Sequence, residues 1–332
     1  MRTKIVYSLV SDSRDHFLEQ LLISSYSVKK HNPDAHITLV TDNISNAEIT
    51  GDRSNALKYI DEKIVVQTPE LGKKSRSRWL KTSIRQIVKG DYLFIDTDTI
   101  ITKSISEVDS LDIKIGAVLD RHLPIDKNQR GDDIIKQCKK SGWEPKEKDF
   151  LYFNSGVMLV KDCPEAHNLY NKWHDIWQHS FEHGIDIDQP ALGLANRQAG
   201  YLIKEIDGTW NCQVLGNGLK YMHSAYILHY YNTDSRTNLH SNPFIFSSRT
   251  FQEQIAKDKF ILSDALKAKI NSSHEQFSDS YELISNEKMD VYNTEAVQFV
   301  IRTINKSRFV NLIVSGMAQA INMIMKKSKI KK

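Results

Sequence analysis

Short runs of hydrophobic residues alternate along the chain with longer segments that carry apolar residues at helical spacing. A bounded apolar run is typical of a buried strand, whereas apolar positions three and four residues apart are typical of a helix. These runs predict strands at residues 5–10, 37–40, 64–66, 92–95, 115–119, 153–160, 202–206 and 226–231. The helical spacing predicts helices at residues 14–31, 76–88, 164–181 and 189–197. This order of elements predicts an α/β fold with a mainly parallel sheet covered by helices on both faces.

The first predicted helix carries signals at both of its ends. Asp12 or Ser13 is expected to cap its first turn, because short side-chain oxygens accept hydrogen bonds from the free N–H groups there. Asn32 and Pro33 mark its end, because proline cannot continue a helix.

The pattern divides the chain into three parts. Residues 1–240 are expected to form the main α/β domain, and within it residues 120–152 are rich in charges and form an insertion or surface loop. Residues 241–296 are expected to form a polar helical extension, and residues 297–332 a basic amphipathic tail.

Composition and cysteine content narrow the class of protein. The 332 residues are 40% hydrophobic and 26% charged, as in an ordinary globular protein. The three cysteines lie far apart and form no C-x-x-C pair, so neither a disulfide framework nor a zinc site is expected. The first apolar run, residues 5–10, is too short for a signal peptide. A cytoplasmic location is the expectation.

The tail differs in charge from the rest of the chain. Eight basic residues and no acidic residue follow Glu295, within a total net charge of +4. Residues 309–325 carry no charge, and as a helix they would be about 26 Å long, short of the roughly 30 Å of a bilayer core. Their polar residues form one stripe on the helix, Asn311, Ser315, Gln319 and Asn322.

This pattern predicts that residues 309–332 lie in the interface of an anionic membrane, so that the protein is peripheral at the inner face. The alternative is a helix that packs on the body or on a partner chain. Arginine and aromatic residues are not interleaved as in nucleic-acid-binding proteins, so no nucleic acid is expected as a partner.

Two carboxylates follow one of the buried strands. Asp96 and Asp98 come directly after the apolar residues 92–95. Ligands of open α/β sheets bind at the carboxyl ends of strands. Paired carboxylates there could hold Mn²⁺ or Mg²⁺, which prefer oxygen ligands and bridge phosphates. A D-x-D pair is common by chance, and Asp186 with Asp188 forms a second one.

A phosphatase chemistry is the main rival for this pair. Haloacid-dehalogenase-type phosphatases carry D-x-D-x-[TV] on an early strand. Here Ile100 occupies the last position of that pattern, the threonine is Thr99, and three predicted strands precede the strand that leads to Asp96. The sequence therefore disfavours this alternative.

Further segments occur in a characteristic order around the D-x-D pair. They are residues 5–8 (IVYS) with the serine-bearing helix at 21–25, Arg78 eighteen residues before Asp96, residues 153–158 (FNSGVM), residues 188–192 (DQPAL), residues 210–211 (WN) and residues 227–230 (ILHY). Over residues 4–235 this order resembles glycosyltransferase family 8, a GT-A family of retaining enzymes.

The resemblance implies a GT-A fold and a UDP-sugar donor, with galactose or glucose as the transferred sugar. It implies Asp96, Asp98 and His229 as metal ligands, with Gln189 facing the anomeric carbon and Asp188 holding donor hydroxyls. The donor-binding residues that it implies are Ser8, Val10, Arg78, Asp96, Thr97, Asn154, Ser155, Asp188, Gln189 and Arg236. In the family a K-P-W turn contacts the diphosphate, and residues 232–236 lack this turn; Arg236 is expected to replace its lysine.

Each of these residues also has a structural interpretation. His229 ends an apolar strand and could complete a metal site, but a lone histidine is often structural. Arg78 could orient an Asp of the metal site or contact phosphate, or it could lie on a solvated basic face. Asn154 and Ser155 suit sugar hydroxyls or a tight turn, and Asp188 could cap the following helix.

Two functions remain open at this point. The first is a retaining, metal-dependent hexosyltransferase that builds a cell-surface glycan on a glycan or lipid-linked acceptor. The second is a catalytically silent GT-A module that serves as a binding subunit. Acceptor contacts are expected in variable loops such as residues 120–152.

Overall fold

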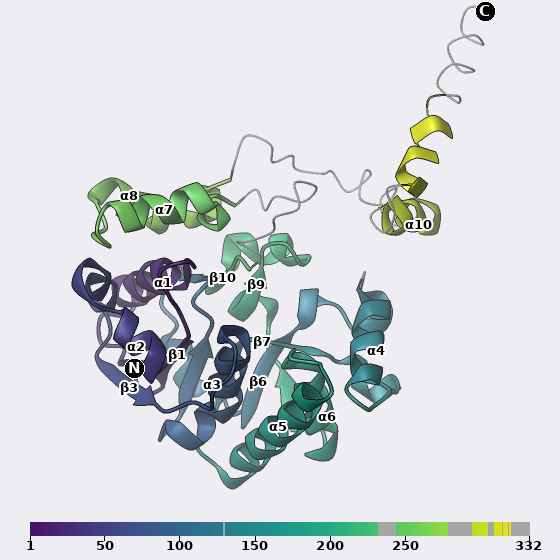
Figure 1. Cartoon of the computed structure of the whole chain (residues 1–332), viewed down its shortest axis with the longest axis horizontal. Helices are drawn as coiled ribbons and strands as arrows, with labels where there is room; N and C mark the ends of the chain where they lie inside the picture. Colours follow the sequence, from purple (N-terminus) through teal and green to yellow (C-terminus); the bar gives the residue numbers. More distant parts are fainter. Residues whose placement is uncertain are drawn as a thin grey trace, which may run out of the picture. The chain divides into compact units, whose positions relative to one another are not determined.

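The computed structural model describes residues 1–128, 130–231, 244–277, 294–304, 309–313, 315–317 and 319. Its contacts divide the chain into two units, Met1–Asp279 and Ser280–Lys332 (Figure 1).

A seven-stranded sheet with the order β3-β2-β1-β4-β7-β6-β8 forms the centre of the first unit. β7 runs antiparallel to both of its neighbours, and all other pairs are parallel. The predicted mainly parallel sheet is thereby confirmed. The strands are β1 (Lys4–Leu9), β2 (Ile37–Asp42), β3 (Glu62–Val66), β4 (Tyr92–Ile95), β6 (Ile115–Leu119), β7 (Phe153–Val160) and β8 (Ile203–Glu205).

A second, three-stranded sheet lies beyond the end of β4. It consists of β5 (Thr99–Ile101), β10 (Ile227–His229) and β9 (Cys212–Gln213), in the order β5-β10-β9. β10 pairs antiparallel with β5, so that His229 lies opposite Thr99. The strand expected at residues 226–231 is therefore shorter than predicted, and its pairing brings His229 beside the turn that leaves β4.

Helices cover both faces of the large sheet. α1 packs on one face, and α3, α5 and α6 pack on the other (Figure 1). β1 shows why the sheet needs both layers, because Ile5 and Tyr7 belong to the hydrophobic cluster around α1 whereas Val6 belongs to the cluster around α3. The helices of this unit are α1 (Phe17–His31), α2 (Asn43–Glu48), α3 (Lys73–Ile87), α4 (Gly131–Lys140), α5 (Pro164–Glu182), α6 (Gln189–Gln198), α7 (Arg249–Lys257) and α8 (Asp264–Asn271).

The start of α1 differs from the prediction. Its N-cap residue is His16, so the expected cap at Asp12 or Ser13 is wrong. Asp15 accepts hydrogen bonds from the backbone N–H groups of Asp12, at 3.0 Å, and Phe17, at 3.1 Å. The Asp12 carboxylate in turn accepts from the backbone N–H of Arg14 at 2.8 Å. The acidic residues thus stabilise a turn ahead of the helix, and this turn delays its start.

Residues 120–152 contain more structure than a surface loop. α4 lies within them, and they form a small hydrophobic cluster of their own that includes Ile134, Cys138 and Trp143. The Trp143 indole donates to the carbonyl of Pro190 at 3.1 Å, which ties this segment to α6. The segment is therefore folded and is attached to α6.

Residues 244–277 pack on the same hydrophobic cluster as α1. Phe244, Phe246, Ile255 from α7 and Ile270 from α8 are buried in it. The domain boundary expected at residue 240 falls within residues 232–243, which are outside the described residues, and it stays a prediction.

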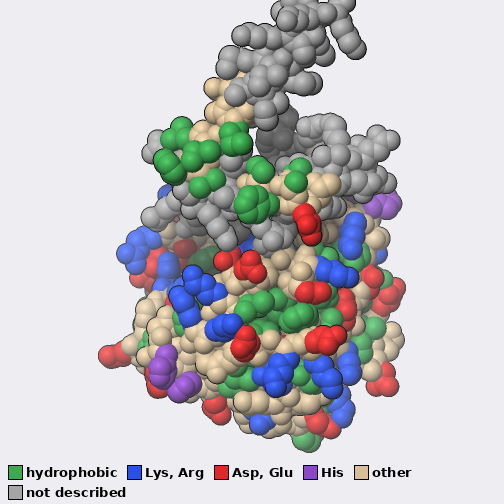
Figure 2. Space-filling view, turned by 90° about the vertical axis from the view of Figure 1, so that its right-hand side faces the viewer, with side chains coloured by type: hydrophobic (Ala, Val, Ile, Leu, Met, Phe, Trp, Pro, Cys, Tyr) green, Lys and Arg blue, Asp and Glu red, His purple; other side chains and the backbone are tan. Residues whose placement is uncertain are grey.

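The second unit contains α10 (Glu295–Ile304) and helical residues between 309 and 319. Asn311 accepts a hydrogen bond from Ser315 at 3.2 Å, so these two members of the expected polar stripe share a face. In the upper part of Figure 2 hydrophobic side chains gather on this unit. The exposed ones are Phe299, Val300, Phe309, Leu312, Ile313 and Met317. Among the described residues, no helix has the length and apolar character needed to span a membrane.

Candidate functional site

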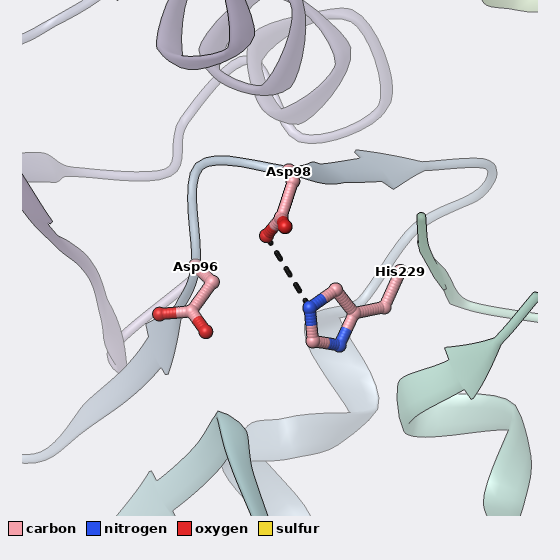
Figure 3. A group of neighbouring side chains, drawn as sticks. All are labelled: Asp96, Asp98 and His229. Carbon is pink, nitrogen blue, oxygen red and sulfur yellow. Dashed lines mark ion pairs between the residues drawn. The ribbon is translucent and has the colours of Figure 1, made fainter. Parts of the chain in front are cut away.

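The carboxylates of the D-x-D pair and an imidazole converge beyond the carboxyl end of β4. Asp96 follows β4 directly, Asp98 precedes β5, and His229 ends β10 (Figure 3). One ligand atom from each of the three lies within 4.8 Å of those of the others. His229 Nε2 is 3.3 Å from Asp98 Oδ1, and the Tyr230 N–H donates to the Asp98 carbonyl at 3.0 Å. The structure thus brings together all three residues that the sequence suggested as metal ligands.

A buried asparagine sets the orientation of the His229 ring. Asn211 donates through its amide nitrogen to Asn154 Oδ1 at 3.0 Å, which leaves its own oxygen to accept from His229 Nδ1, also at 3.0 Å. With the proton on Nδ1, the lone pair of Nε2 is directed toward Asp98. Metal-binding histidines are commonly held in this way by a partner on their second nitrogen. The residues present therefore fit a divalent cation.

Gly156 provides the space for this cluster. A Cβ atom at this position would lie 2.3 Å from His229 Cε1 and 2.9 Å from both Asp96 Oδ2 and Asn154 Oδ1. The Gly156 carbonyl also accepts from the Asp96 N–H at 2.7 Å. A side chain here would displace the imidazole, so the glycine is required by close approach and not by an unusual backbone angle.

Lys81 of α3 was not among the residues chosen from the sequence. Its ammonium group donates to the two carboxylate oxygens of Asp96 at 2.9 and 3.0 Å, and its side chain is only 6% exposed. Of the roles considered for Arg78, the contact with an Asp of the metal site is not made, because Arg78 pairs with Asp188. Its contact with a phosphate stays a prediction. Helical spacing could have pointed to Lys81, because it lies one turn after Arg78 on the same face of α3.

Burial and charge shift the pKa values in this cluster. Burial raises the pKa of Asp96 above its ordinary value, and the opposing effect of Lys81 does not cancel the rise. Burial also acts to raise the pKa of Asp98, but His229, a backbone hydrogen bond and Lys81 together lower it. For His229 burial acts to lower the pKa, yet the attraction of Asp98 and Asp96 raises it overall.

Asp188 is held by a cation and a hydroxyl. Arg78 Nε is 3.0 Å from Asp188 Oδ1, and the Ser155 hydroxyl donates to Oδ2 at 3.0 Å. Burial acts to raise the pKa of Asp188, but Arg78, Lys81 and Ser155 together lower it, so the carboxylate stays ionised. Asp188 occupies the N-cap position of α6, but its side chain makes no capping hydrogen bond. Its carboxylate is therefore directed by Arg78 and Ser155.

Asp120 links two of the predicted donor-binding residues. Its Oδ1 accepts from Asn154 Nδ2 at 3.1 Å and from Gln189 Nε2 at 3.3 Å. Gln189 Nε2 also donates to the Phe153 carbonyl at 3.3 Å, so both of its N–H groups are used and the amide oxygen is the atom left for a ligand. The sequence interpretation missed Asp120, although it follows the buried strand β6 as Asp96 follows β4.

These residues line one cavity of about 550 Å³. The predicted residues on its wall are Ser8, Val10, Arg78, Asp96, Thr97, Asp98, Asn154, Ser155, Asp188, Gln189 and His229. The wall also contains Phe17, Gln20, Lys74, Arg121, Arg130 and Gln137, none of which was predicted. Arg236 lies outside the described residues. A single cavity thus holds carboxylates, amides and cations from segments that are widely separated in the chain.

Solved structures of similar fold are glycosyltransferases. An active-site mutant of LgtC has a TM-score of 0.50 at 14% identity, with 80% of this chain and 100% of that chain covered. The galactosyltransferase LgtC in complex with donor and acceptor sugar analogs has a TM-score of 0.48 at 15% identity, with the same coverage. Mouse xyloside xylosyltransferase 1 in its apo form has a TM-score of 0.45 at 15% identity, with 69% of this chain and 97% of that chain covered. The fold is that of the GT-A glycosyltransferases.

A family model gives the assignment within this class. The model of glycosyl transferase family 8 matches residues 8–236, which is more than half of the chain. The protein therefore belongs to this family and is a glycosyltransferase of the retaining GT-A type. No curated protein sequence matches the chain significantly.

Proposed function

We propose that the protein transfers a hexose, galactose or glucose, from a UDP-sugar to a glycan or lipid-linked acceptor. The observation that carries this proposal is the cluster of Asp96, Asp98 and His229 on the wall of a cavity that also contains Asp188 and Gln189. Two carboxylates with one neutral imidazole suit Mn²⁺, or Mg²⁺ as the harder alternative. A divalent cation bound there would offset the negative charge that builds up on the diphosphate leaving group.

The residues of the chain prepare the site for the sugar. Asp188 is ionised and positioned by Arg78 and Ser155, so it can accept hydrogen bonds from donor hydroxyls. Gln189 is fixed through its nitrogen, so its amide oxygen is available at the anomeric carbon, where positive charge develops in the transition state. Preorganised dipoles of this kind lower the barrier because they need no rearrangement during the reaction.

The direct test is metal-dependent release of UDP from a panel of UDP-sugars, which needs no acceptor. Asp98→Asn and His229→Ala should each lower the rate about 100-fold or more, because each removes a group that holds charge at the leaving group. Asp112→Asn and His223→Ala are matched controls, because both residues are exposed and line no part of the cavity. Full activity of Asp98→Asn or His229→Ala would contradict the assigned site.

The same assay addresses the alternative of a silent binding subunit. Calorimetric binding of UDP with Mn²⁺, but no turnover with any donor, would favour that alternative over the transferase.

We also propose that the C-terminal segment places the enzyme on an anionic membrane at the inner face of the cell. Support comes from the exposed apolar side chains of residues 299–317 together with the basic residues after Glu295. Residues 320–332, which carry five of these bases, lie outside the described residues. Equal sedimentation with anionic liposomes of the full chain and of a chain that ends at Glu295 would contradict the anchor.

A further inference from the structure

The segment that follows β6 has an unusual backbone. Arg121 and His122 are consecutive non-glycine residues with φ angles of 54° and 58°. This left-handed conformation is costly for residues with a Cβ atom and persists only where neighbouring groups enforce it. Such strain is concentrated at functional sites, so the segment Asp120–His122 calls for a physical explanation.

Side chains from the β9 region hold this turn. The Gln213 amide accepts from the Arg121 N–H at 2.8 Å and donates to the Leu119 carbonyl at 2.8 Å. The Gln213 N–H donates to His122 Nε2 at 3.1 Å, and Asn217 donates to the Arg121 carbonyl at 3.2 Å. Four hydrogen bonds therefore keep Arg121 in a conformation that its own backbone disfavours.

Arg121 also differs from the other cations of the cavity in its charge environment. Four cations on the cavity wall lie near carboxylates: Lys74 at 2.7 Å from Asp186, Arg78 at 3.0 Å from Asp188, Lys81 at 2.9 Å from Asp96 and Arg130 at 3.8 Å from Asp133. Within the part of the chain that the structure describes, the guanidinium of Arg121 pairs with no carboxylate. A half-buried guanidinium on a cavity wall is suited to an anion of the ligand.

The position of Arg121 indicates which anion. Its turn is bonded to Gln213, which pairs with His229 across β9 and β10. Its neighbour in the chain, Asp120, contacts the amide of Gln189. Arg121 therefore lines the same cavity as the proposed metal ligands and the proposed sugar site, on a turn whose neighbours are connected to both. In a nucleotide-sugar the group between these two points is the distal phosphate, which bonds to the sugar.

We propose that Arg121 binds the distal phosphate of the donor and that the strained turn Asp120–His122 exists to present it. This inference rests on the proposed use of a nucleoside diphosphate sugar. A fixed guanidinium at this phosphate would hold the donor and stabilise the charge that the leaving group gains. Arg121 would thereby make the contact with the diphosphate that the sequence analysis assigned to Arg236.

The test compares UDP with UMP, which lacks the distal phosphate. Arg121→Gly should weaken calorimetric binding of UDP in the presence of Mn²⁺ by about 10-fold or more, the effect of one charge-assisted hydrogen bond, and leave UMP binding unchanged. The melting temperature of Arg121→Gly should be equal to that of the wild type or higher, because glycine accepts a positive φ without strain. Arg121→Lys, which keeps the charge, should bind UDP with intermediate affinity.

Arg249→Ala is the matched control, because Arg249 is exposed, pairs with Glu253 on α7 and gives the same change in net charge. Unchanged UDP binding by Arg121→Gly would overturn the proposal, as would a parallel loss of UDP and UMP binding. A lower melting temperature together with loss of both ligands would show a structural role instead. Failure of the wild type to bind UDP or to release it from any donor would count against the proposed function itself.

Discussion

Two walls of the cavity hold their charges in different ways. The metal wall consists of Asp96, Asp98 and His229, which lie at the ends of β4, β5 and β10. His229 is close to Asp98, and Lys81 from α3 forms an ion pair with Asp96. The turn wall, Asp120–His122, follows the end of β6 and presents Arg121 on a strained backbone, with no carboxylate partner among the residues described. The metal wall thus suits the proposed cation, and the turn wall suits the proposed anion.

The two walls should therefore respond differently to substitutions. On the metal wall each side chain is close to its neighbours, so a loss of space or of a hydrogen-bond partner should disturb cation binding. On the turn wall the important property is the direction of one side chain, so removal of the guanidinium should alter ligand binding and leave stability intact.

Among changes that leave the three proposed metal ligands in place, the largest effect is expected from Gly156→Ala, which would disturb the metal wall. The new Cβ would lie 2.3 Å from His229 Cε1, so the imidazole must move. Metal-dependent release of UDP should fall by about 100-fold, as for a displacement of about 1 Å in a catalytic group. Gly72→Ala is the control, since no atom lies within 4 Å of its added Cβ. Wild-type rates with Gly156→Ala would argue against the proposed geometry.

A smaller effect is expected when only the orientation of His229 is disturbed. Asn211→Leu removes the acceptor for His229 Nδ1 while keeping the branched shape of the side chain. The affinity for Mn²⁺, measured by calorimetry, should fall by about 10-fold or more, as is typical when the partner of a metal-binding histidine is lost. Asn211→Asp keeps an acceptor and should retain more affinity. If both variants bound Mn²⁺ like the wild type, Asn211 would have no part in holding the ring.

A change of pH should affect the two walls differently without any substitution. The pKa of His229 is raised, so its imidazole becomes protonated at a higher pH than an ordinary histidine. A proton on Nε2 competes with the cation, and the affinity for Mn²⁺ should fall about tenfold per pH unit below this pKa. Arg121 stays charged throughout, since guanidinium does not titrate in this range. An Mn²⁺ affinity that is constant on both sides of about pH 6.5 would exclude His229 as a ligand.

The elements that the sequence predicted best are those buried on both sides. β4, β6 and β7 have the predicted bounds, because continuous apolar runs with turn residues at each end leave little choice. The start of α1 was missed because Asp15 competes with the expected caps for backbone N–H groups. The helix and small hydrophobic cluster within residues 120–152 were missed because their apolar residues are sparse and meet only on folding.

The candidate site was predicted in part. Residues that stand in family motifs were found, and Asp96, Asp98 and His229 do lie together. Asp120 was missed, although it directly follows β6. The pairing of Arg78 with Asp188 and of Lys81 with Asp96 was not predicted, because it depends on which carboxylate each side chain can reach from α3.

The α/β alternation, the D-x-D pair at the end of β4 and the family can be recognised without a structure, because periodicity and motif order can be read along the chain. Which side chains are in contact depends on the tertiary structure. Lys81 meets Asp96, Asn211 turns His229, and Gln213 holds Arg121 in its left-handed turn. Each of these contacts joins residues far apart in the sequence, and their distances depend on how the sheets and helices pack.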